Sequence, residues 1–175
     1  MVNPFYTIGH STRAIPDFVA LLRIGSVELV ADVRTVPRSR TNPQYNKDAL
    51  PAGLEPYGIA YEHFPELGGL RKKPAKPLEV NGFWTNPSFR NYADYALTDA
   101  FRAGLERLIL RGHERRIAIM CSEAVWWRCH RRIIADYLLS RGETVFHLMD
   151  TGRAEPAKMT EAASPRQDGT IDYPA

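Results

Sequence analysis

Four short segments of this sequence gather histidine, arginine, cysteine and acidic side chains, the residue types that hold anions and move protons. They are residues 9–13, 32–40, 62–69 and 121–131. Each segment follows a run of residues that favours a β-strand. If those strands are parallel, the segments meet at one edge of a sheet, and the sequence predicts one shared site there.

Arginines dominate the predicted anion-binding set. A guanidinium group can hold two phosphate or carboxylate oxygens at once, and residues 37–40 offer two such groups beside a hydroxyl. Asp32 lies inside an apolar run, so its carboxylate needs a partner such as Arg13 or Arg34. The predicted substrate-binding residues are Arg13, Asp32, Arg34, Arg38, Arg40, Cys121, Arg128, His130 and Arg131.

Three residues are candidates for proton transfer: His10, His63 and Glu123. Glu123 falls between a strand end and a helix start, where its carboxylate can approach Arg128 or His10. Either histidine can equally be a hydrogen-bonded structural residue. The sequence has no glycine-rich nucleotide loop and no Walker-type loop, so we expect hydrolytic or glycosidic chemistry without a cofactor.

The two cysteines are expected to differ. Cys121 ends a strand ahead of a helix, where helix amides can lower a thiol pKa. Six residues, none of them glycine, separate Cys121 from Arg128, which differs from the loop of a phosphatase. We therefore expect Cys121 to form part of the polar wall of the site. A nucleophilic Cys121 is the alternative. Cys129, one helical turn from Trp126 and Ile133, is expected to be buried and inert. No second ligand cluster has zinc spacing, and we expect no metal.

Strands are predicted at residues 6–8, 27–33, 58–61, 116–120 and 144–148. Helices are predicted at residues 16–25, 48–57, 86–109 and 127–140. Strands that alternate with helices indicate an α/β fold: a single three-layer domain with a mostly parallel sheet of about five strands and helices on both faces. We expect residues 1–149 to form this domain and residues 150–175 a tail packed on it.

The motifs together resemble the family labelled domain of unknown function 488. The resemblance covers nearly the whole chain and rests on residues 6–12, 32–40, 67–69, 121–123, 129–131 and 168–174. It groups the motif residues and implies no particular reaction. A weaker similarity to rhodanese-like domains rests on residues 32–34 and Cys121, but the short cysteine loop is absent, so sulfur transfer does not follow.

Composition narrows the function classes. Of 175 residues, 44% are hydrophobic and 25% charged, which is typical of a globular chain. No apolar run approaches the roughly 18 residues of a membrane span, and no secretory signal is evident, so we expect a cytoplasmic protein without membrane contact. Four cations without a carboxylate occur in residues 34–47 and again in residues 68–78, which favours phosphate-bearing partners.

The leading hypothesis is therefore an enzyme that acts on a phosphate-bearing small molecule or nucleic acid. The first alternative is a non-catalytic nucleic-acid-binding module that stacks bases on Phe83 and Trp84. The second is a protein-interaction domain whose motifs only brace the sheet edge. The sequence leaves the substrate, the oligomeric state and any partner protein open.

Overall fold

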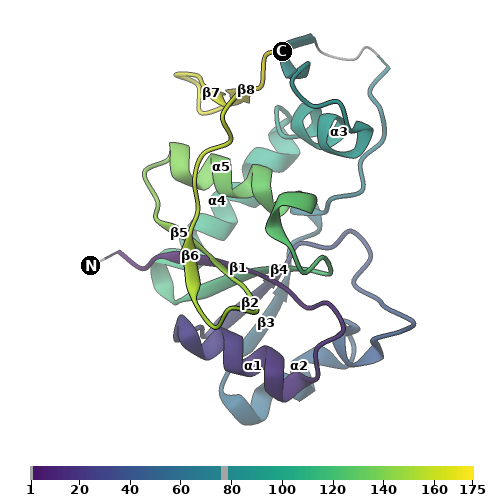
Figure 1. Ribbon diagram of the computed structural model, residues 1–175, viewed down its shortest axis with the longest axis vertical. Coiled ribbons are helices and arrows are strands. Elements are labelled where there is room, and N and C mark those ends of the chain that lie inside the picture. Colours follow the sequence, from purple (N-terminus) through teal and green to yellow (C-terminus); the bar gives the residue numbers. More distant parts are fainter. Residues whose placement is uncertain (1, 76–78) are drawn as a thin grey trace.

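The computed structural model describes residues 2–75 and 79–175, which form a central sheet with helices on both faces (Figure 1). One face is covered by α1 (Ile15–Ile24) and α2 (Leu50–Leu54). The other is covered by α3 (Pro87–Tyr95), α4 (Asp99–Glu114) and α5 (Arg131–Ser140). The predicted three-layer α/β fold is confirmed.

Six strands form the main sheet in the order β3-β2-β4-β1-β5-β6. Strands β1 to β5 are parallel, as predicted, and β6 is an antiparallel edge strand that was not predicted. Their bounds in chain order are Phe5–Gly9, Leu29–Asp32, Ala60–His63, Ile117–Cys121, Val145–Leu148 and Ala154–Pro156. Gly9 lies opposite Cys121, and Asp32 lies opposite His63, so the motif segments leave the sheet side by side.

The central strands are buried on both faces, which explains their nearly continuous apolar sequences. On β4, Ile117, Ile119 and Cys121 belong to the core beneath α4 and α5, whereas Ala118 and Met120 belong to the core beneath α1. Successive side chains of a strand point to opposite faces. This alternation places Cys121 on the α5 side of the sheet.

The single helix predicted at residues 86–109 is wrong, because α3 and α4 are separate helices. Asn86 caps α3 as predicted, and its side chain accepts a hydrogen bond from the Ser88 N–H at 2.8 Å. Thr98 caps α4 by accepting from the Phe101 N–H, and Asp99 places negative charge in the first turn. Both helices bury apolar residues in the same core, so the hydrophobic periodicity did not reveal the break.

Two other predicted helices are shorter than expected. The helix expected from residue 127 begins at Arg131, after a 3-10 turn at Trp126–Arg128. Of the helix expected at residues 48–57, only α2 (Leu50–Leu54) is α-helical. A 3-10 turn at Glu55–Tyr57 follows it, where Pro56 supplies no amide donor. The remaining 3-10 turns are Pro43–Tyr45, Pro65–Leu67 and Glu79–Asn81.

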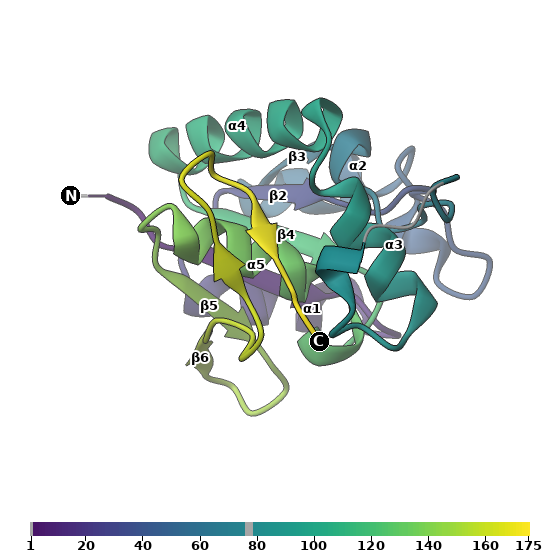
Figure 2. The same ribbon diagram turned by 90° about the horizontal axis from the view of Figure 1, so that it is seen from above.

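The C-terminal segment crosses the α5 side of the molecule (Figure 2). It includes a short antiparallel pair, β7 (Ser164–Pro165) and β8 (Ile171–Asp172), joined by a turn in which Gly169 has positive φ. Beyond β8, Tyr173 is fully buried, and its hydroxyl donates a hydrogen bond to Asp136 of α5 at 2.8 Å. The last residues therefore contribute to the core beneath α5.

Candidate active site

A cavity of about 480 Å³ lies at the carboxyl edge of the sheet. Its walls come from the segments that follow β1, β2, β3 and β4, together with the first turn of α3. The four motif segments thus meet around one space of the size that small-molecule sites have. The predicted site residues that line it are His10, Arg34, Arg38, Cys121, Glu123, Arg128 and His130.

Arg34 is fixed by a buried ion pair with Asp32. Its Nε donates to Oδ1 at 2.9 Å and its Nη2 to Oδ2 at 2.7 Å, and the Asp32 side chain is fully buried. Tyr61 also donates its hydroxyl to Asp32, while the Tyr45 carbonyl accepts from Arg34. Asp32 has the buried partner that the sequence required, but it lies behind the cavity wall.

His10 is held in its neutral form. Its ring stacks on Tyr45 with 4.3 Å between ring centroids, and its Nδ1 lies 2.8 Å from the Ser11 carbonyl oxygen. A carbonyl can only accept, so Nδ1 carries the proton and Nε2 accepts from Arg34 Nη1 at 3.3 Å. Burial, aided by the Arg34 charge, lowers the pKa of His10 to about 4, although the Ser11 hydrogen bond raises it. Both ring nitrogens are engaged.

His63 and Arg13 do not line the cavity. His63 Nε2 donates to the Arg34 carbonyl oxygen at 2.8 Å and holds the backbone that follows β2. Arg13 donates through Nε to the Gly9 carbonyl and pairs with Asp150 at the surface. Their contacts hold loops next to the cavity.

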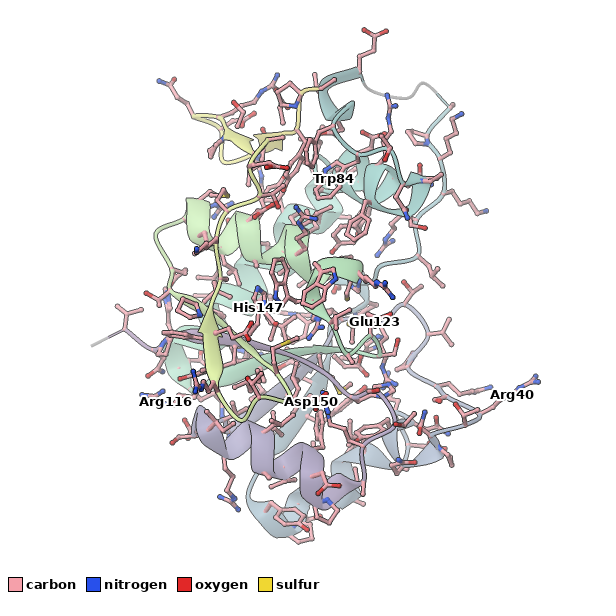
Figure 3. All side chains as sticks on the ribbon, in the orientation of Figure 1. Arg40, Trp84, Arg116, Glu123, His147 and Asp150 are labelled. Carbon is pink, nitrogen blue, oxygen red and sulfur yellow. The ribbon has the colours of Figure 1, made fainter. Side chains whose placement is uncertain are left out.

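Arg38 and Arg128 are exposed arginines on the cavity wall. Within residues 2–75 and 79–175, neither side chain forms an ion pair or hydrogen bond with another residue. Arg40 does not line the cavity, and it extends from the outer tip of its loop away from the molecule (Figure 3). The segment at residues 37–40 therefore presents one guanidinium group to the cavity and one to solvent.

Glu123 occupies the loop between β4 and α5 (Figure 3), and its exposed side chain lines the cavity. Its backbone is held tightly: the carbonyl accepts from Arg131 Nη2 at 2.8 Å and lies against Gly9. A Cβ atom at position 9 would lie 1.8 Å from that carbonyl oxygen. Only glycine allows the loops after β1 and β4 to approach this closely.

Cys121 and Cys129 both line the cavity, both are buried, and neither is in a disulfide. Cys129 Sγ accepts from the Arg131 N–H at 3.4 Å and lies 3.4 Å from His130 Nδ1. His130 Nε2 donates to the Val33 carbonyl oxygen at 2.8 Å. Cys129 is buried, as predicted, but it faces the cavity.

Sequence reasoning missed several cavity residues, among them Thr35, Val36, Ser39, Leu70, Phe89 and Cys129. Cys129 was assigned inward by helical spacing from Trp126, but the helix begins only at Arg131 and the spacing does not apply. The sequence did contain a signal for Cys129: it is followed by His130 and precedes a helix. Both a neighbouring histidine and a helix N-terminus can lower the pKa of a thiol.

The described cations of the second basic stretch, Arg71, Lys72 and Lys73, do not line the cavity. Arg71 turns back, donating to the Gly68 and Pro65 carbonyls, and its guanidinium stacks over Tyr95. Lys76, also predicted to belong to this stretch, lies outside the described residues.

The predicted stacking pair is also wrong in part. Trp84 is only 5% exposed, and its ring packs between the core and Phe89, 4.9 Å away between centroids. A buried indole cannot stack on a base, because its faces are already covered. The nucleic-acid-binding alternative loses one of its two proposed stacking residues, whereas Phe83 is only partly buried.

Fold and cavity define a parallel α/β protein with a polar site at the carboxyl edge of its sheet. The family model described as "Domain of unknown function DUF488" matches residues 14–138, and the chain belongs to this family. No curated protein and no solved structure matches the chain.

The described part of the chain lacks two kinds of feature. None of its helices has the length and apolar character needed to cross a membrane. The same residues contain no group of three or more histidine, cysteine or acidic side chains arranged to hold a metal ion.

Proposed function

We propose that this protein is an enzyme that binds a small phosphate-bearing molecule in the cavity and cleaves it hydrolytically. The observation that supports this proposal is the pair Arg38 and Arg128, two cavity-lining arginines without partners in the described part of the chain, on the same cavity as Glu123. Unpaired guanidinium groups at a concave site attract a bidentate anion such as phosphate.

The apolar side of the cavity favours a nucleotide-like ligand. Val36 and Leu70 are 58% and 72% exposed, and both line the cavity with Phe89. Exposed aliphatic side chains beside cationic ones suit a molecule with a flat apolar part and a charged part. The cavity is sized for a mononucleotide rather than for a duplex.

Glu123 is the best-placed proton-transfer group. It is exposed to the cavity, whereas both nitrogens of His10 are engaged and His63 does not line the cavity. A carboxylate near two arginines can activate a water molecule for attack on a phosphoester or glycosidic bond. His10 acts in this scheme as a positioning residue for Arg34.

Isothermal titration with inorganic phosphate and with adenosine monophosphate tests the anion site. Replacing Arg38 and Arg128 together by Gln should weaken binding at least about tenfold, because each charge-assisted hydrogen bond contributes roughly 1.5–3 kcal/mol. Arg40→Gln, in the same loop but outside the cavity, is the matched control and should bind like the wild type. Equal losses in Arg40→Gln and the double variant would indicate general surface attraction.

Hydrolysis of a nucleotide panel tests the chemistry. Glu123→Gln should abolish product formation while phosphate binding persists. Binding without turnover of any nucleotide by the wild type would contradict the enzymatic part. Tighter binding of single-stranded oligonucleotides than of mononucleotides, with a steep salt dependence, would instead favour the nucleic-acid module.

A further inference from the structure

Arg131 is a fully buried arginine without a carboxylate partner. Its Nη2 donates to the Glu123 carbonyl oxygen at 2.8 Å, but Nε and Nη1 have no hydrogen-bond partner, sulfur included, in the part of the chain that the structure describes. The ionisable groups that interact electrostatically with the guanidinium are the thiols of Cys121 and Cys129 and, more weakly, Glu123, which is exposed.

A buried guanidinium needs a compensating negative charge. Arginine stays protonated in proteins, so it cannot lose its charge as a buried lysine can. An uncompensated buried ion costs several kcal/mol. The thiols beside Arg131 are the buried groups that can supply the negative charge, as a thiolate.

The hydrogen bonds select Cys129 as the ionised thiol. Cys129 Sγ accepts from a backbone N–H, which favours a negative sulfur. Cys121 Sγ instead lies 3.8 Å from the Glu123 carbonyl oxygen, an acceptor that keeps the Cys121 proton in place. Cys129 Sγ also lies 3.4 Å from Nδ1 of His130, a ring that is held in place by the hydrogen bond from its Nε2 to the Val33 carbonyl oxygen.

The pKa directions agree with this arrangement. Burial raises the pKa of Cys121 well above its usual value. Burial also raises the pKa of Cys129, but its interactions with the neighbouring Cys121 thiol, His130 and Arg131 outweigh burial, so the pKa of Cys129 lies well below its usual value.

The other groups that face Cys129 do not supply the missing charge. Burial lowers the pKa of His147 of β5 to about 3, with the Arg131 charge acting in the same direction, so its imidazole is neutral. Burial raises the pKa of Tyr92 of α3 well above its usual value, so its phenol is neutral too. Glu123 is the one other anion here, and its carboxylate is exposed to the cavity.

We propose that Cys129 is a second nucleophile of the cavity, besides the water molecule that Glu123 activates, that it is held as a thiolate by Arg131, and that it attacks small electrophiles that carry an anionic group. The electron pair of the sulfur forms the new bond, and the leaving group departs with the pair of the bond that breaks. The preference for an anionic group rests on the proposed function of Arg38 and Arg128. The ionisation of Cys129 does not depend on that anion site.

Alkylation with iodoacetamide tests the thiolate. Sulfur attacks the methylene carbon, the C–I bond breaks, and iodide leaves; peptide mass spectrometry identifies the modified cysteine. Cys129 should react first, at a rate that changes less than about twofold between roughly pH 6.5 and 8.5, whereas an ordinary thiol accelerates about 50-fold over this range. Slow labelling of Cys129 with the ordinary pH profile would overturn the proposal.

Variants identify the counterion. Cys121→Ser should keep the rapid labelling within a few-fold, and Cys129→Ser should abolish it. Arg131→Met should give Cys129 a steep pH profile, while Arg131→Lys, which keeps a cation, should retain a flat one. If folded Arg131→Met still alkylates Cys129 at a rate independent of pH, Arg131 does not stabilise the thiolate. If an Arg131 variant does not fold, the pH profile of the wild type still tests whether Cys129 is a thiolate.

Iodoacetate, an anion with the same leaving group, separates the two parts of the proposal. Relative to free cysteine, Cys129 should prefer iodoacetate over iodoacetamide by about tenfold, because cationic clefts concentrate anions. Arg38→Gln with Arg128→Gln should remove the preference without slowing iodoacetamide, and Arg153→Gln, outside the cavity, should not change it. An alkylation rate that is independent of pH but shows no preference for iodoacetate would contradict the anion site and still support the Cys129 thiolate.

Discussion

Arg34 donates through Nη1 to Nε2 of His10, 3.3 Å away, while Nε and Nη2 of the same guanidinium bind Asp32. One side chain thus joins the loop after β1 to the end of β2. Since Arg34 is always charged, His10 can take part in this contact only as a neutral acceptor. Protonation of His10 would place two cations against each other at the cavity wall.

The first prediction concerns acid stability. The pKa of His10 is lowered to about 4 in the folded state, so the unfolded chain takes up the proton first as the pH falls. The contribution to stability is complete above about pH 6.5 and is lost as the pH falls toward about 4, up to about 3 kcal/mol. Urea unfolding of the wild type and His10→Gln across this range should show a gap that changes with pH. A constant gap would refute the neutral, buried His10.

The buried ion pair gives a second prediction. Asp32→Asn should destabilise the fold by about 3–5 kcal/mol, because it leaves the Arg34 charge buried without a partner. Asp150→Asn removes the carboxylate of a surface pair with Arg13, and should cost less than about 1 kcal/mol. Thermal unfolding of both variants measures the difference. Similar losses in the two would show that Arg34 gains compensation elsewhere.

A third prediction follows from the contact between Gly9 and the loop of Glu123. Gly9→Ala should cost roughly 1–3 kcal/mol, since the added methyl group would force the Glu123 carbonyl away. It should also weaken phosphate binding by displacing the loop that leads to Arg128. Gly53→Ala in α2, whose nearest neighbouring atom is 4.0 Å from the added carbon, should be neutral or stabilising by up to about 1 kcal/mol. Normal stability of Gly9→Ala would mean that the two loops are not in contact.

A fourth prediction follows from the Cys129 thiolate: the stability of the fold should depend on pH between about 6 and 8.5. A thiol whose folded pKa is lowered adds stability that is complete above the unfolded pKa, about 8.5, and is lost as the pH falls toward the folded value. The stability of the wild type relative to Cys129→Ser should therefore rise from pH 6 to about 8.5. Chemical unfolding under reducing conditions measures this difference, and the stability of the wild type relative to Cys121→Ser should show no such rise over the same pH range. A difference that falls with pH would argue for a protonated Cys129.

The sheet was largely predictable because its strands leave a strong local signal. The run at β4 is apolar throughout and the run at β2 is apolar up to Asp32, and Gly9 and Cys121 mark where two neighbouring strands end. The sequence also implied that His10, Arg38 and Glu123 would approach one cavity, since parallel strands end at the same edge.

The rest depended on tertiary geometry. Arg38 and Arg40 are alike in sequence, and only the path of the loop directs one to the cavity and the other to solvent. The burial of Arg131 became visible only when the start of α5 was known, because a 3-10 turn at Trp126–Arg128 replaces the helix that periodicity predicted. Hydrophobic patterns do not encode which polar residue a buried cation will contact.

A crystal structure of the protein soaked with adenosine monophosphate is the most direct test of the anion site at the centre of this account. We expect a phosphate group in the cavity within hydrogen-bonding distance of Arg38 or Arg128, near Glu123 and Cys129, with the base against Val36, Leu70 or Phe89. An empty cavity at saturating nucleotide, or phosphate bound only to arginines outside it such as Arg40, would contradict the central claim.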